Sequence, residues 1–90
     1  MKRAVITVVG KDTVGIIAKV CTYLANENVN ILDISQTILK EFFNMIMIVD
    51  ISNAGNDFVK IANGLEELGN SMGLVIRIQR EDIFDMMHRI

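Results

Sequence analysis

The spacing of apolar residues changes repeatedly along this chain, and these changes constrain the fold more than any other feature. Four runs have the alternating or β-branched pattern of strands. They cover residues 3–9, 29–39, 42–51 and 74–80. Between them, residues 14–26 and 58–72 carry apolar side chains three and four positions apart, which predicts two amphipathic helices. Lys40 and Glu41 predict a hairpin turn between the two middle strands.

The resulting order, βαββαβ, predicts an α+β fold: a ferredoxin-like sandwich over residues 1–90 as a single domain. Its four-stranded antiparallel sheet has both helices on one face and the first and third strands in the centre. The first strand is apolar on both faces, with Ile6 and Val8 on one side and Val5 and Val9 on the other. Because helices on one side bury only one face, the remaining apolar face predicts a homodimer.

The first helix is expected to bury one stripe of side chains. The members of this stripe are Val14, Ile17, Ala18, Cys21, Leu24 and Ala25. The chain ends in residues 81–90, acidic at their start and basic at their end, which predicts a short terminal helix.

Composition excludes several classes of function. The formal net charge is −2, and the basic residues are scattered, so no nucleic-acid partner is expected. No apolar run reaches the roughly 18 residues of a membrane span. The single cysteine, Cys21, permits no intramolecular disulfide, which suits the cytoplasm.

The segment from Gly10 to Gly15 joins the first strand to the first helix. Its glycine spacing matches a phosphate-binding loop, but Ile16 and Ile17 follow where that loop needs Lys and Ser or Thr. The two glycines are equally well explained by a tight turn and close helix packing.

Polar groups in the same segment favour a different ligand. Either Asp12 or Thr13 can cap the helix. If Thr13 does so, the Asp12 carboxylate is free to pair with a ligand ammonium group, and the amides of Val14, Gly15 and Ile16 can donate to a ligand carboxylate.

Catalysis has weaker support. His88 is the only histidine and lies near the end of the chain, and Cys21 belongs to the apolar stripe of the first helix. Glu66 and Glu67 lie on the polar face of the second helix. We therefore expect no catalytic residues, no metal site and no cofactor.

The segment 12–20, Asp-Thr-Val-Gly-Ile-Ile-Ala-Lys-Val, followed by Asn-Val-Asn-Ile at 28–31, resembles the ACT-domain signature. Residues 31–37 and 77–84 are similar to a short, stand-alone ACT family of uncharacterised function. This resemblance implies a ferredoxin-like sandwich that dimerises and binds an amino acid near the subunit interface, between the first loop and the start of the second strand.

The same resemblance implies that Asp12 and Asn30 contact the ligand, with Ile31 beside them. An asparagine side chain can donate to a carboxylate and accept from an ammonium group; Asn30 is equally explained as an ordinary polar residue at a strand start. Two positions depart from the family pattern. Val14 replaces a frequent proline, and Gly10 replaces the histidine of serine-binding members.

Two functions follow as hypotheses. The first is a non-enzymatic regulatory module that binds an amino acid as a homodimer and acts on a separate effector protein. The alternative is a structural adaptor that recruits a protein partner without any ligand.

Overall fold

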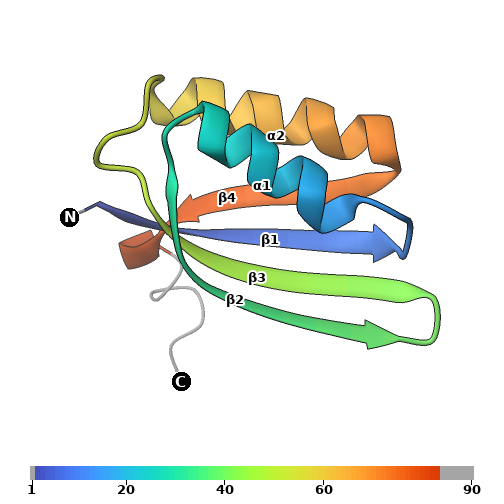
Figure 1. Ribbon diagram of the computed structural model, residues 1–90. Helices are drawn as coiled ribbons and strands as arrows, with labels where there is room; N and C mark the ends of the chain where they lie inside the picture. Colours follow the sequence, from blue (N-terminus) through green and yellow to red (C-terminus); the bar gives the residue numbers. More distant parts are fainter. Residues whose placement is uncertain (1, 84–90) are drawn as a thin grey trace.

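The computed structural model describes residues 2–83 and contains one four-stranded sheet with two helices on one face (Figure 1). The strands are β1 (Arg3–Lys11), β2 (Asn30–Leu39), β3 (Phe42–Asp50) and β4 (Leu74–Arg80), and the helices are α1 (Ile16–Asn26) and α2 (Phe58–Met72). The sheet order is β2-β3-β1-β4, and every neighbouring pair is antiparallel. The predicted α+β ferredoxin-like βαββαβ fold is therefore confirmed.

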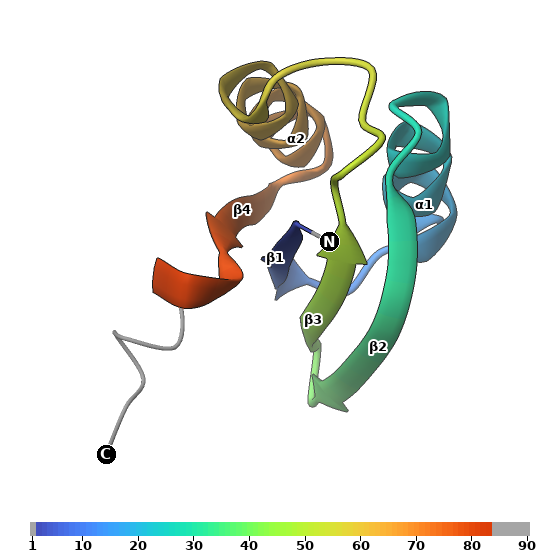
Figure 2. The same ribbon diagram turned by 90° about the vertical axis from the view of Figure 1, so that its left-hand side faces the viewer.

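The core lies between the helices and the sheet, and Figure 2 shows both helices on the same side of the sheet. Alternate residues of β3 face the helices and are buried, which follows from the two-residue period of a strand. These residues are Phe43, Met45, Met47 and Val49. The two helices meet where the Tyr23 hydroxyl donates to the Ile61 carbonyl oxygen at 3.4 Å.

The buried stripe of α1 differs from the predicted one. The helix starts at Ile16, and its buried side chains are Ile16, Val20 and Leu24, four residues apart. Val14 precedes the helix and is 96% exposed, while Ile17 is 38% exposed. The predicted stripe, counted from Val14, therefore does not coincide with the buried face of the helix. The reason is that the helix begins only after the left-handed residue Gly15.

The predicted hairpin turn is present at Lys40, whose φ of 59° is left-handed. Residues 81–83 form helical backbone directly after β4. The rest of the predicted terminal helix, including His88, lies outside the described residues.

Candidate functional site

The loop between β1 and α1 is held against the β2–β3 hairpin turn. The Asp12 amide donates to the Glu41 carbonyl oxygen at 2.7 Å, and the Lys11 ammonium lies 3.8 Å from the Glu41 carboxylate. Both side chains of this ion pair are largely exposed, so the backbone hydrogen bond contributes more to the position of the loop than the charges do.

Helix α1 begins without a side-chain cap. Its N-cap residue is Gly15, with φ 88°, and within residues 2–83 no side chain accepts a hydrogen bond from the first turn. The expected cap at Asp12 or Thr13 is therefore wrong: Asp12 stands three positions before the N-cap and Thr13 two, whereas a capping side chain belongs to the N-cap residue itself.

The later start of the helix also changes which amides are available. The first intrahelical bond runs from the Lys19 amide to the Gly15 carbonyl oxygen at 3.0 Å. The amides of residues 15–18 consequently lack an intrahelical partner. Gly15 and Ile16 remain candidate donors as predicted, while Val14 stands outside the helix and offers a fully exposed side chain instead.

The Asp12 side chain is exposed beside this helix start. Its carboxylate makes no hydrogen bond or ion pair with any other residue of the described part of the chain. The Ile16 side chain is buried in the core, so that residue can contact a ligand only through its backbone. One short segment thus presents a carboxylate and several helix amides to solvent.

Asn30 and Ile31 lie at the other end of the sheet. Asn30 pairs with Asp50, which pairs with Arg3 at the start of β1. β1 has 9 residues, so at about 3.3 Å per residue its two ends lie on the order of 25 Å apart. A single chain therefore does not bring Asn30 together with Asp12, and one amino acid cannot touch both within one protomer.

Packing explains the departure at Gly10. This residue lies between Phe43 and Leu74 in the sheet, and a Cβ atom there would stand 2.6 Å from Leu74 Cδ2 and 3.1 Å from the Gly73 carbonyl oxygen. Any larger side chain, histidine included, requires the Leu74 side chain to move and the adjoining backbone to give by a few tenths of an ångström. Glycine at this position serves the close approach of β4 to β1.

The beginning of α2 contains a cap that we did not predict. The Asp57 carboxylate accepts a hydrogen bond from the Lys60 amide at 2.8 Å. Asp directly before the first apolar residue of a periodic run is a known signal for a helix start. That signal was present at Asp57 and Phe58.

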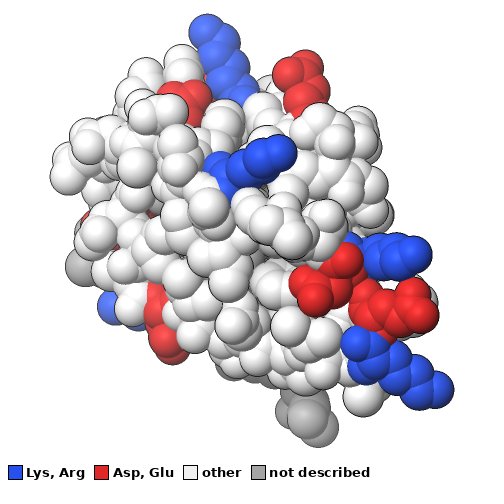
Figure 3. Space-filling view, turned by 45° about the vertical axis from the view of Figure 1, so that its right-hand side comes forward, with Lys and Arg blue, Asp and Glu red and all other residues white. Residues whose placement is uncertain are grey.

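Other kinds of site find little support in the described residues. Within residues 2–83, no three His, Cys, Asp or Glu side chains are grouped as metal ligands, and no helix is long and apolar enough to cross a membrane. Cys21 is half-buried in α1. Acidic and basic side chains are interspersed on the face shown in Figure 3, without a continuous basic surface.

Residues 2–79 match the ACT domain family. The chain belongs to this family. A UPF0237 protein of Bifidobacterium longum is 62% identical to it over the whole of both chains. UPF0237 is an uncharacterised family.

Solved structures agree with this assignment. An ACT domain protein from Streptococcus pneumoniae superposes on this ACT domain with a TM-score of 0.81 and 43% identity, over 93% of this chain and 94% of that one. A putative glycine cleavage system transcriptional repressor superposes with a TM-score of 0.74 and 25% identity, over 88% of this chain and 45% of the repressor. ACT domains are regulatory domains that bind small molecules.

Proposed function

We propose that this ACT domain is a non-enzymatic, cytoplasmic regulator that binds an amino acid as a homodimer and thereby changes its association with a separate effector protein. The observation that carries the proposal is the start of α1, where uncapped amides lie beside the unpaired carboxylate of Asp12. Amides at the positive end of a helix suit a ligand carboxylate, and Asp12 suits an ammonium group. An amino acid supplies both charges.

A second copy of the chain is needed to complete the site. β2 is an edge strand of 10 residues, and its exposed side chains include Ile34 and Ile38. A long, apolar edge strand with free backbone groups is a template for pairing with another strand. Two β2 strands related by a twofold axis would pair antiparallel.

Such a pair would bring the separated site residues together. Leu39, at the end of β2, lies at the same end of the sheet as Asp12, because it pairs with Phe42 and Phe42 pairs with Lys11. In an antiparallel β2 pair, the start of one strand lies beside the end of the other. The second copy would therefore place its Asn30 and Ile31 near the first copy's Asp12, Gly15 and Ile16.

Regulation would then follow from this arrangement. A ligand held between two copies stabilises the dimer over the separate chains by its differential affinity. The matched repressor contains its ACT-like part within a longer protein. By analogy, this ACT domain would act on its effector by associating with a separate chain.

Thermal-shift measurements with the twenty amino acids test ligand binding. A ligand at about 100 times its dissociation constant adds about 2.7 kcal/mol to the free energy of unfolding. We expect a hit with the wild-type protein and none with Asp12→Ala or Asn30→Ala.

Mixing the two variants tests the composite site. A D12A chain paired with an N30A chain restores one intact site per mixed dimer, so about a quarter of all sites should bind ligand again after subunit exchange. No recovery despite subunit exchange, measured by calorimetric stoichiometry, contradicts a site shared between subunits.

A specific feature favours the alternative function, an adaptor without a ligand. The sheet face away from the helices carries several exposed apolar side chains near the hairpin end: Val9, Phe42, Ile46 and Val75. Exposed apolar patches mark protein interaction sites. A dimer that binds no amino acid, but loses a partner when Ile46 is replaced by serine, would support the adaptor.

A further inference from the structure

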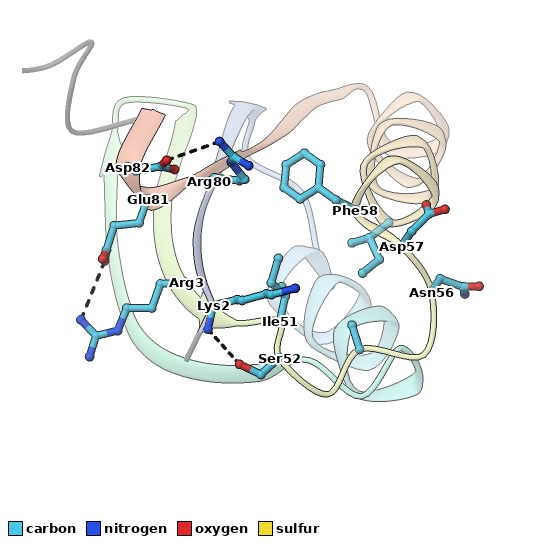
Figure 4. Close-up of a pocket in the computed structure, with 12 residues that line it drawn as sticks. Lys2, Arg3, Ile51, Ser52, Asn56, Asp57, Phe58, Arg80, Glu81 and Asp82 are labelled. Carbon is cyan, nitrogen blue, oxygen red and sulfur yellow. Dashed lines mark hydrogen bonds and ion pairs between the residues drawn. The ribbon is translucent and has the colours of Figure 1, made fainter.

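A second candidate site lies at the end of the sheet where β1 starts, opposite the loop that contains Asp12. A cavity of about 660 Å³ opens there between the sheet, the loop from β3 to α2, and the first turn of α2 (Figure 4). Cavities that bind small molecules have volumes of roughly 300 to 1,000 Å³. This cavity is therefore large enough for a metabolite.

Hydrogen bonds hold the outer wall of the cavity in place. In the loop from β3 to α2, the Gly55 amide donates to the Glu27 carbonyl oxygen at 2.9 Å, and the Asn56 side chain donates to the Glu27 carboxylate at 2.9 Å. The Asn28 side chain donates to the Asn53 carbonyl oxygen at 2.8 Å. These bonds tie the loop to the end of α1, so the cavity is formed without a ligand.

The acidic side chains around the cavity already have hydrogen-bond or ion-pair partners, whereas one lysine does not. The Asp57 carboxylate caps α2, Asp82 lies 3.3 Å from the Arg80 guanidinium, and Glu81 lies 3.9 Å from the Arg3 guanidinium. Each acidic group thus has a partner already. The Lys2 ammonium makes no ion pair with any residue between 2 and 83. The Lys2 ammonium is therefore the charged group available to pair with a ligand, and it would pair with an anion.

The floor of the cavity is apolar. Phe58 projects from the first turn of α2 toward the sheet, and Lys2 extends across the cavity from the start of β1 (Figure 4). Ile61 also lines the cavity and is 1% exposed. Apolar surface with a few placed polar groups is the usual composition of a small-molecule site. Here Phe58 and Ile61 supply apolar contact, and charged side chains line much of the remaining wall.

We propose that this cavity binds a small organic carboxylate with an apolar body, held by Lys2 through its charge and by Phe58 and Ile61 through contact. The site is independent of the amino-acid site proposed above, because the two share no residue and the cavity is contained within one chain. Either site can be disproved without affecting the other.

Titration of the isotopically labelled full chain with phenylacetate, followed by amide NMR, tests the proposal. We expect saturable shifts in the signals of residues 52–58, with the signals of residues 10–16 unchanged. Phenylacetamide has the same body without the charge and should bind at least about fivefold more weakly, as expected for a loss of about 1 kcal/mol from a partly exposed ion pair.

Two lysine variants provide a matched comparison. Lys2→Met should weaken phenylacetate binding about fivefold, whereas Lys19→Met, which removes an exposed lysine from α1, should leave it unchanged. Phe58→Leu keeps an apolar side chain for folding and should also weaken binding. Absence of saturable shifts at millimolar phenylacetate, equal binding of phenylacetamide, or equal effects of the two lysine variants would overturn the proposal.

Discussion

The two helices of this ACT domain begin in different ways. Helix α2 follows an extended residue, Asp57, whose carboxylate accepts from the Lys60 amide at 2.8 Å. Helix α1 follows a left-handed residue, Gly15, and no side chain within residues 2–83 caps it. A capped start uses its amides for stability, whereas an uncapped start leaves them for water or a ligand.

The surroundings reinforce this contrast. The start of α2 borders a loop that is hydrogen-bonded to the end of α1. The loop before α1 is joined to the hairpin turn by the Asp12 amide, and its carboxylate projects to solvent. We therefore expect the start of α2 to serve stability and the start of α1 to serve ligand binding, and substitutions can test this division.

The largest effect is expected at Gly15. Replacing Gly15 by alanine should lower the free energy of unfolding by about 1–2 kcal/mol, because an L-residue disfavours the left-handed conformation. A Cβ atom there meets no heavy atom within 4 Å, so the loss arises from the backbone alone. Urea unfolding measures it, and Gly15→Asn should lose less because asparagine tolerates positive φ. An unchanged midpoint for Gly15→Ala would show that the loop can adopt another conformation.

The next effect concerns the cap of α2. Asp57→Ala should lower the free energy of unfolding by about 1 kcal/mol, since the Lys60 amide loses its acceptor. Asp57→Asn retains an acceptor and serves as the control in the same urea experiment. A loss equal to that of Asp57→Ala in the asparagine variant would assign the effect to charge rather than to the hydrogen bond.

The corresponding change before α1 should be nearly silent for stability. Asp12→Ala and Thr13→Ala should each change the free energy of unfolding by less than about 0.5 kcal/mol, because neither side chain caps the helix. Asp12→Ala should nevertheless abolish stabilisation by the amino-acid ligand. If Asp12→Ala or Thr13→Ala lowered the free energy of unfolding as much as Asp57→Ala does, the two helix starts would not differ in their contribution to stability.

The smallest expected effect is on the pH dependence of stability, through Asp50 at the end of β3. Hydrogen bonds from the Ser52 hydroxyl and amide lower the pKa of Asp50 below its ordinary value of 3.8. A lowered pKa in the folded state stabilises the protein at neutral pH, and this contribution disappears as the pH falls through that pKa. Ser52→Ala should raise the Asp50 pKa and reduce this acid-dependent loss. Carboxyl NMR titration measures the change, with Ser71→Ala as the control; an unchanged Asp50 pKa in Ser52→Ala would exclude the hydroxyl as the cause.

Sequence reasoning succeeded where the determining interactions are local. Apolar spacing predicted each strand and helix, and the order of elements restricted the sheet to a ferredoxin-like arrangement, because chain connections are short and sequential strands tend to be neighbours. The grouping of Asp12, Gly15 and Ile16 in one strand-to-helix turn was also predictable, because these residues are nearly consecutive; their role in ligand binding stays a prediction.

Two features could be decided only by tertiary structure. The phase of α1 depends on the left-handed conformation of Gly15, which moves the buried stripe to Ile16, Val20 and Leu24. The distance between Asp12 and Asn30 depends on the course of β2, which is antiparallel to β3 and so runs in the same direction as β1. Its start therefore lies at the end of the sheet opposite the first loop.

Sequence by itself therefore determined the elements, their order and the polar groups that each turn presents, because spacing and turn chemistry act over a few residues. Tertiary structure decided which of those groups share a location, because strand pairing and register join residues far apart in the chain. For this protein, that difference places the predicted ligand residues Asp12 and Asn30 at opposite ends of the sheet within one chain.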